Sequence, residues 1–410
     1  MLYKNLKSSD PEIYKLIKAE TRRQQTELTL IASENYAWPA VLETLSSPLT
    51  NKYAEGYAGK RYYSGNKIID KVETLAIERA KTLFGAEHAN VQALSGTPAN
   101  LAIYAALCNY GDTILGLSLS HGGHLSHGHS VSASGKLYKF INYEVDQTSE
   151  QIDFEKVRQL ALDNRPKIIV AGFSAYPRAI DWQKFRNICD EVGAFLVADI
   201  SHAAGLIAAG ALPNPTAIAD VVMMTTHKTL RGPRAAIVLC KQSLAEKIDK
   251  AIFPGYQGGP HENTIAAVAV CLQKAGQPEF KTYAEQIMAN AKVMADEFLA
   301  LGYRLVSGGT DTHLLILDLS HKNITGREAE KLLELAGINT SRSTIPFDPL
   351  PPTKASGLRL GTAAITARGM GMTEVKNLVR LIDEILKTND KKLAKAKKTE
   401  IKELGKKFPL

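Results

Sequence analysis

Short apolar runs alternate with amphipathic helical patterns through the middle of the chain, and this alternation most constrains the fold. Five runs are predicted as strands: 112–119 (DTILGLSL), 167–172 (KIIVAG), 194–199 (AFLVAD), 220–226 (DVVMMTT) and 235–240 (AAIVLC). Strands that are apolar on both sides and alternate with helices are typical of a mostly parallel sheet covered on both faces. The sequence therefore predicts an α/β fold.

A length of 410 residues exceeds what one hydrophobic core usually supports, so more than one domain is expected. Beyond residue 280 the pattern changes to that of an α+β unit. Its predicted elements are strands 303–308, 313–319 and 357–362 and a helix at 326–337. We predict an N-terminal helix and arm at 1–50, a large domain at 51–280 and a smaller C-terminal α+β domain at 281–410.

Composition excludes several classes of protein. No run approaches 18 apolar residues, so no membrane span is expected. The N-terminus has neither an apolar signal core nor an amphipathic presequence, so a cytoplasmic location is expected. The four cysteines are far apart, which fits reduced thiols. From Lys387 onward nine lysines face three acids, which accounts for +6 of the net charge of +8. Without interleaved aromatics this segment predicts a solvated helix with apolar contacts at Leu393, Ile401 and Leu404, and makes nucleic acid an improbable partner.

Polar residues follow several of the predicted strands. Asp199 ends one strand, Lys228 follows another within TTHKTLRGPR, and Ser174 follows a third. The carboxyl ends of parallel strands meet at one edge of a sheet, so these side chains should converge. Lys228 either extends its amine to solvent or keeps it partly desolvated, ready to form an imine with an aldehyde.

Asp199 favours the second interpretation of Lys228. A carboxylate at the end of a core strand is costly unless a cation or donor meets it, and the protonated ring nitrogen of pyridoxal phosphate would do so. Ser95, Gly96 and Thr97 precede a helix opened by Pro98, and a helix start offers N–H groups to a phosphate. The run HGGHLSHGH holds four histidines in a spacing that fits no zinc pattern; we expect no metal, and one ring packed on a flat cofactor.

These motifs, with others along the chain, resemble the serine hydroxymethyltransferase family. The resemblance is nearly end to end and includes LIASENY, SGTPAN, HGGHLSHG, VADISHAAGLIAAG, TTHKTLRGPR, FPGYQGGP and GLRLGTAAITARGM. It implies the fold of type I pyridoxal-phosphate transferases, whose large domain contains a mostly parallel seven-stranded sheet between helices. It also implies interconversion of L-serine and glycine with tetrahydrofolate as carrier, through aldimine and quinonoid chemistry.

The resemblance assigns roles to individual residues. Lys228 would hold the cofactor aldehyde, Asp199 the pyridine nitrogen, and His124 would stack on the ring. The other implied cofactor-binding residues are Ser95, Gly96, Thr97, Ser174, His202, Thr225 and His227, joined by Tyr53, Gly258 and Gly259 of a neighbouring subunit. The implied catalytic residues are Lys228, Asp199, His124, His202, Glu55 and Tyr63. Glu55 and Tyr63 would also come from the neighbouring subunit, with Glu55 as general acid or base. The chain should therefore form a homodimer or a tetramer with shared sites.

Substrate residues are implied in the same way. Arg359 would hold the substrate carboxylate, together with Ser33, Tyr63 and Glu55. The implied folate-binding residues are Tyr62, Leu119, Gly123, Leu125 and Ser343. The chain departs from the family pattern at Ser47-Pro48, Ala58, 261–263 (HEN) and 341–343 (SRS). Because Ser343 replaces an asparagine that helps to hold the pterin, a folate-independent aldolase acting on threonine-like or α-methylserine substrates is the alternative.

Overall fold

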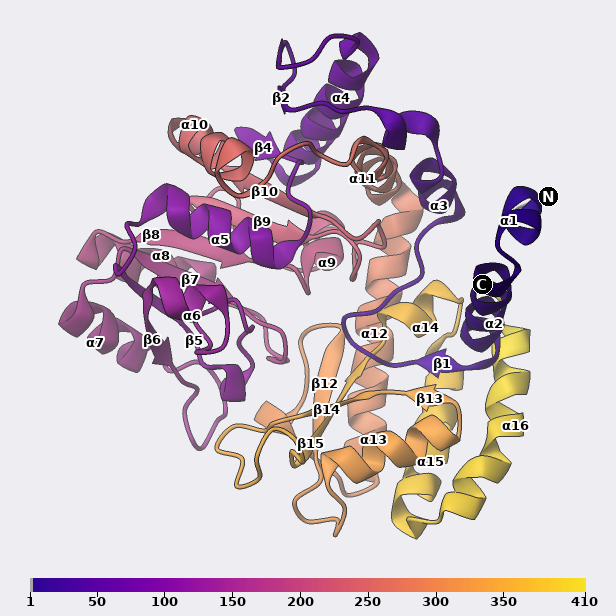
Figure 1. Ribbon diagram of the computed structural model, residues 1–410. Helices are drawn as coiled ribbons and strands as arrows, with labels where there is room; N and C mark the ends of the chain where they lie inside the picture. The colour runs from indigo at the N-terminus through magenta and orange to yellow at the C-terminus, as the bar shows by residue number, and fades with distance from the viewer. Residues whose placement is uncertain (1–2) are drawn as a thin grey trace.

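A seven-stranded sheet lies at the centre of the larger unit in the computed structural model, which describes residues 3–410 (Figure 1). In spatial order its strands are β4 (His88–Asn90), β10 (Ala236–Cys240), β9 (Val221–Thr225), β8 (Phe195–Asp199), β7 (Ile168–Gly172), β5 (Thr113–Leu117) and β6 (Lys139–Tyr143). β10 runs antiparallel to both of its neighbours, and the remaining pairs are parallel. The predicted α/β class and mostly parallel sheet are confirmed.

All five strands predicted from apolar runs are present. β4 and β6 were not predicted, and both lie at the edges of the sheet. β4 is only three residues long and contains His88 and Asn90, while β6 buries only Tyr143 of its five residues. An edge strand has one neighbour and a partly solvated face, so its sequence need not be continuously apolar.

Alternate residues of each central strand face opposite layers of helices, as the pleat requires. In β8, Leu196 and Ala198 belong to one apolar cluster and Val197 to another. The first cluster is covered by α4 (Lys67–Phe84), α7 (Phe154–Asn164), α8 (Trp182–Val192) and α11 (Glu262–Ala275). The second is covered by α5 (Gly96–Leu107) and α10 (Ala245–Lys250). Shorter helices are α3 (Pro39–Leu45), α6 (Ala133–Leu137) and α9 (Ala204–Ala208).

The smaller unit is built on a separate four-stranded antiparallel sheet. Its strands, in spatial order, are β11 (Arg304–Leu305), β12 (Leu314–Asp318), β15 (Gly357–Gly361) and β14 (Ser341–Ser343). Its helices are α13 (Gly326–Leu335), α14 (Ala363–Ala367), α15 (Met372–Thr388) and α16 (Lys391–Lys407). α12 (Pro278–Ala300) joins the two units: Ile287 packs with the large sheet and Phe298 with the smaller one.

The N-terminal segment also packs on the smaller unit. α1 (Lys4–Ser9) precedes α2 (Pro11–Thr26), whose cap Asp10 accepts hydrogen bonds from the backbone N–H groups of Glu12 and Ile13. The amphipathic pattern of residues 10–30 favours a helix through residue 30. The helix instead ends at Thr26, because β1 (Leu28–Thr29) pairs in parallel with β13 (Ile338–Asn339).

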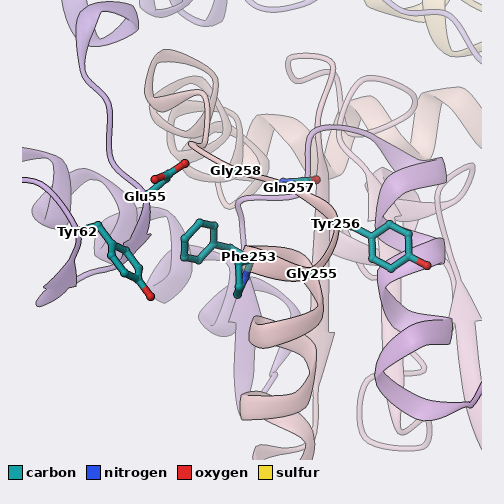
Figure 2. Close-up of a pocket in the computed structure, with 8 residues that line it drawn as sticks. Glu55, Tyr62, Phe253, Gly255, Tyr256, Gln257 and Gly258 are labelled. Atoms are coloured by element: carbon teal, nitrogen blue, oxygen red, sulfur yellow. The ribbon is translucent and has the colours of Figure 1, made fainter.

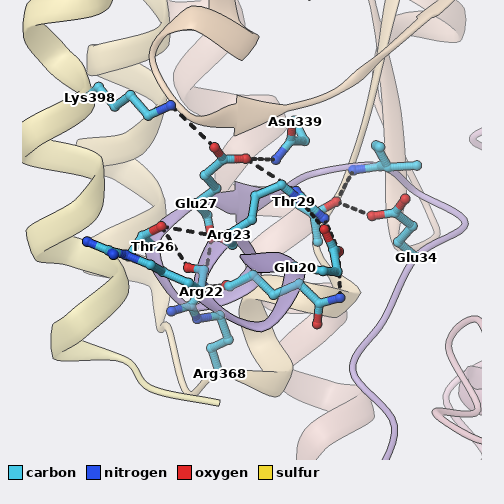
Figure 3. Close-up of polar contacts among 12 residues, drawn as sticks. Glu20, Arg22, Arg23, Thr26, Glu27, Thr29, Glu34, Asn339, Arg368 and Lys398 are labelled. Carbon is cyan, nitrogen blue, oxygen red and sulfur yellow. Dashed lines mark hydrogen bonds and ion pairs between the residues drawn. The ribbon is translucent and has the colours of Figure 1, made fainter. Parts of the chain in front are cut away.

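Polar contacts fix this N-terminal segment to the C-terminal helices (Figure 3). Glu27 accepts a hydrogen bond from Asn339 at 3.1 Å and pairs with Lys398 at 3.4 Å. Arg368 is 5% exposed and donates only to backbone carbonyls. Its acceptors are the carbonyl oxygens of Gln24, Gln25, Glu27, Gly405 and Phe408. One buried guanidinium thus joins the end of α2 to the end of α16.

The lysine-rich C-terminal segment is the predicted surface helix, α16. Ile401 is fully buried, and Leu404 packs partly against the cluster of the smaller unit, while Leu393 is half-buried. Among the helices of residues 3–410, none combines the length and the hydropathy needed to cross a membrane.

Replacing Arg368 by methionine should destabilise the protein strongly. Arg368→Met keeps a side chain of similar length but leaves five buried or half-buried carbonyls without their charged donor, a loss of about 3 kcal/mol or more in the free energy of unfolding. Thermal unfolding followed by circular dichroism would measure it. Arg380→Met is the matched control because Arg380 is 67% exposed and should change stability little. Equal midpoints for the two variants would contradict the role assigned to Arg368.

Candidate active site

A cavity of about 160 Å³ lies where the predicted polar residues meet, at the carboxyl ends of the central strands. It is lined by Ser95, Gly96, Thr97, Asn100, His124, Phe173, Ser174, Asp199, Ser201, His202, Met223, Thr225, His227, Lys228 and Arg234. Ten of these are the cofactor-binding residues expected from one chain. The structure therefore brings together residues as far apart in the chain as Ser95 and Lys228.

Lys228 lines this cavity, and within residues 3–410 it has one hydrogen-bond partner. Its Nζ donates to Oγ1 of Thr225 at 2.8 Å. Burial lowers the pKa of Lys228 to about 8, with the charges of Arg359 and Arg234 acting in the same direction and Asp199 opposing them. A partly neutral amine at physiological pH is a usable nucleophile toward an aldehyde.

Asp199 is a buried carboxylate that keeps its charge. Its Oδ2 accepts from Nε2 of His127 and Nδ2 of Asn100, both at 3.1 Å, and its Oδ1 accepts from the backbone N of Ser201 at 3.1 Å. Burial alone would raise the pKa of this carboxyl. The contacts of His127 and Ser201 outweigh burial and hold the pKa below its usual range. Asp199 can therefore stabilise a positive charge in the cavity.

The N-terminus of α5 forms another wall of the cavity. Ser95 precedes the helix, and no side chain caps the first turn. Gly96 is required here because a Cβ would lie 2.8 Å from Cγ2 of Thr225. The backbone N–H groups of the first turn are thus available to an anion, and the helix dipole favours one.

Three neutral histidines border the cavity. Nδ1 of His124 contacts Oγ of Ser126 at 2.8 Å, and burial lowers the pKa of His124 to about 4. Burial also lowers the pKa of His227, to about 3, and that of His202 well below its usual range. An uncharged ring is suited to pack on a flat cofactor, the role expected of His124.

Residues of the smaller unit reach the same region. Arg359 on β15 donates from Nη1 to the carbonyl oxygen of Ser174 at 2.7 Å and from Nε to Oγ of Ser341 at 3.3 Å. Burial lowers the pKa of Arg359 to about 10, so it remains cationic.

Nδ1 of His202 lies 3.2 Å from Nε2 of His313. Ser33 lines an adjacent cavity of about 310 Å³ that shares the walls His227 and Arg234.

The residues expected from a neighbouring subunit lie together elsewhere on the chain. Glu55, Tyr62 and Gly258 line a cavity of about 480 Å³ that also contains Phe253 (Figure 2). A Cβ on Gly259 would lie 3.0 Å from the ring of Tyr53, and the rings of Tyr53 and Tyr63 are 5.3 Å apart. None of these residues lines the Lys228 cavity of its own chain.

The remaining predicted folate residues lie near one another. Leu119 begins a short 3-10 helix (Leu119–His121), and the neighbouring Ser120 accepts a hydrogen bond from Thr344 at 3.3 Å, next to Ser343. Gly123 and Leu125 follow on the same loop. A Cβ on Gly123 would lie 2.0 Å from the carbonyl of Leu117, which excludes other residues, and Leu125 is 47% exposed.

Several contacts of the site were not predicted. Asn100 and His127 hold Asp199, and Ser341 and His313 contact Arg359 and His202. Asn100 and His127 belong to the motifs SGTPAN and HGGHLSHG, which the sequence analysis singled out. The sequence did not show that both side chains bond to the same carboxylate, Asp199. Within residues 3–410 no group of three or more His, Cys, Asp or Glu side chains is arranged to hold a metal ion.

Comparison with protein families agrees with this geometry. The model of the serine hydroxymethyltransferase family matches residues 6–382 of the 410. The match includes the Lys228 cavity and the Glu55 cavity, and it reaches well into the smaller unit.

Capture of pyridoxal phosphate by the apoprotein should depend on pH through Lys228. The neutral amine reacts, so the rate should rise roughly tenfold per pH unit below about 8 and level off above it. Stopped-flow absorbance of the lysine-bound cofactor would measure the rate. Lys228→Ala should show no such band, whereas Lys250→Ala, at a 72%-exposed lysine, should behave as the unaltered protein. A pH-independent rate between 6 and 8 would refute the assignment.

Proposed function

The chain belongs to the serine hydroxymethyltransferase family and is a pyridoxal-phosphate-dependent enzyme of the glycine hydroxymethyltransferase type, and we propose specific substrates and residue roles on this basis. In this proposal it interconverts L-serine and tetrahydrofolate with glycine and 5,10-methylenetetrahydrofolate. The observation that carries the proposal is the convergence of Lys228, Asp199 and the start of α5 on one cavity, with Arg359 beside it.

The residues present fit pyridoxal phosphate. Uncapped N–H groups at Gly96 and Thr97 suit its phosphate, and the Lys228 amine suits its aldehyde. The ionised Asp199 suits a protonated ring nitrogen. Nδ1 of His227 is buried and has no hydrogen-bond partner in residues 3–410, so the cavity also offers a polar atom that the chain itself leaves unsatisfied.

When bound, the cofactor withdraws electrons from the α-carbon of the amino acid joined to it. Asp199 would hold a proton on the ring nitrogen, and its own position is fixed by His127 and Asn100. His124 would cover one face of the ring and exclude water from it. Ser174 and His202 would contact the cofactor and the substrate from neighbouring walls.

Arg359 would bind the carboxylate of serine or glycine. Its hydrogen bonds to Ser174 and Ser341 use Nη1 and Nε, so Nη2 has no acceptor among residues 3–410. A guanidinium fixed on two sides offers its remaining N–H groups in a set direction, which orients a carboxylate. Ser33, from the adjacent cavity, would assist it.

Glu55 would move the proton at the hydroxymethyl group, in the site of a second copy of the chain. Tyr53, Tyr62 and Tyr63 are 57%, 74% and 50% exposed, an unusual set of exposed aromatics on one surface. Their separation from the Lys228 cavity of the same chain supports a homodimer in which each copy completes the other's site. Tyr62 and the loop from Leu119 to Leu125 would contact the folate.

The folate-independent aldolase remains a second candidate because of Ser343. Its Oγ donates to the carbonyl of Thr344 at 3.0 Å, so this hydroxyl is engaged with the backbone. The cleavage of L-serine should be measured with and without tetrahydrofolate. We expect the rate to depend strongly on folate. Equal rates in the two assays, with faster cleavage of α-methylserine, would favour the aldolase.

Asp199→Asn should separate cofactor binding from catalysis. The amide keeps the size of the side chain but removes the charge, so the variant should retain part of the bound cofactor while kcat falls by a factor of about 10² to 10³. Asp249→Asn is a control, since Asp249 is a half-buried carboxylate of the large unit that contacts His88 and Asn90 instead. Unchanged kcat in Asp199→Asn would contradict the proposed role.

A further inference from the structure

The segment that carries Glu55 is held by one buried arginine. Arg61, whose side chain is 3% exposed, donates from Nη1 to the carbonyl oxygens of Ala54 at 2.8 Å and Gly56 at 2.7 Å, on either side of Glu55. These contacts close the hairpin of β2 (Gly56–Tyr57) and β3 (Lys60–Arg61). The backbone N of Tyr62 also donates to the carbonyl of Glu55 at 3.0 Å. The position of Glu55 therefore depends on the position of Arg61.

Carboxylates of α4 fix Arg61 in turn. Its Nε donates to Asp70 at 2.9 Å, and its Nη2 lies 3.1 Å from Oε2 of Glu73. Gln92 donates to Glu73 at 2.9 Å and to the carbonyl of Gly56 at 3.0 Å, so both of its amide protons are used. Glu73 is 1% exposed, and its Oε2 accepts from Gln92 and lies beside Arg61, whereas its Oε1 has no hydrogen-bond partner in residues 3–410. Burial raises the pKa of Glu73, while Arg61 and Gln92 act in the opposite direction.

Glu262 lies on α11, which packs along α4, and it has no hydrogen-bond donor of its own in residues 3–410. It lies in the first turn of α11, is 1% exposed, and neither carboxyl oxygen has a hydrogen-bond partner in residues 3–410. A buried carboxylate with no donor is unfavourable, whereas a neutral carboxylic acid is tolerated.

We infer that Arg61, Glu73 and Glu262 form a buried positioning device for the Glu55 segment, in which Glu262 is held as the neutral acid so that the single guanidinium stays with Glu73 and Asp70. The inference rests on the proposed role of Glu55. Glu262 is a positioning residue, because it acts on the reaction only through Arg61 and the hairpin.

The charges around Glu262 support this assignment of the proton. α4 contributes Asp70 and Glu73, β3 contributes Arg61, and Lys52 follows the short helix Pro48–Asn51. Arg79 of α4 also contacts α11, but it donates to the carbonyl of Ala269, further along the helix, at 2.8 Å. Burial, followed by the negative charge of Glu73, raises the pKa of Glu262 to about 8. Among the other elements packed on α11, α3 carries only the exposed Glu43, and α12 meets α11 at its opposite end.

The direction in which stability changes with pH follows from the proton on the Glu262 carboxyl. The unfolded carboxyl loses its proton near 4.5, and the folded one near 8. The contribution of Glu262 to stability is complete below 4.5, falls as the pH rises through this interval, and is lost above 8. An ionised Glu262 would then compete with Glu73 for Arg61 and loosen the hold on Ala54 and Gly56.

Glu262→Gln tests the inference, since glutamine is neutral at every pH. The holoenzyme of this variant should unfold within about 1 °C of the unaltered protein at pH 5 and several degrees above it at pH 9. Its kcat for serine cleavage should match at pH 7 and decline less between pH 8 and 9. Glu262→Asp, which can still titrate, should keep the alkaline decline. Glu78→Gln, at an exposed carboxylate of α4 paired only with Lys81, should change neither profile.

Identical pH profiles of the unfolding midpoint for Glu262→Gln and the unaltered protein would overturn the inference, as would a more than tenfold loss of kcat at pH 7 with the cofactor retained. The unfolding measurement needs no turnover. If the protein did not catalyse the proposed reaction, the unfolding midpoints could still be measured. A failure of the proposed function can therefore be distinguished from a failure of the inference about Glu262.

Discussion

The buried charge of Asp199 is the constraint on which the site depends. Asp199 lies at the end of the central strand β8 and is only 6% exposed. Its charge must therefore be stabilised by hydrogen-bond donors. The donors come from three segments: Asn100 from α5, His127 from the glycine-rich loop after β5, and the backbone of Ser201. Satisfying one charge therefore fixes both the start of α5 and the loop that carries His124.

The second requirement is contact between the two units. Arg359 belongs to the smaller sheet, yet it bonds to the carbonyl of Ser174 in the larger unit, and His313 meets His202 in the same region. α12 belongs to both apolar clusters, so it holds the units in one arrangement. The side of the site that carries Lys228 and Asp199 is thus built by the large sheet, and the side that carries Arg359 exists only where the smaller sheet closes on it.

The two buried acids Asp199 and Glu262 differ in their protonation state. Asp199 stays ionised because every oxygen has a donor, whereas Glu262 has none and keeps its proton. The first arrangement prepares a fixed negative charge for chemistry. The second leaves Arg61 free to hold the backbone around Glu55, at a distance from the reacting groups.

The sequence by itself determined the α/β class, the five central strands and the set of motifs, because continuous apolar runs and strand-end polar residues are local signals. It also predicted that Lys228, Asp199 and Ser174 would converge, and all three line one cavity. It did not predict β4 and β6, whose edge positions relax the apolar pattern, nor the end of α2 at Thr26, which is set by pairing with β13. Only the tertiary structure decided that His127 and Asn100 share one carboxylate and that Glu262 lacks a donor, because hydrogen-bond partners far apart in the chain are chosen by packing.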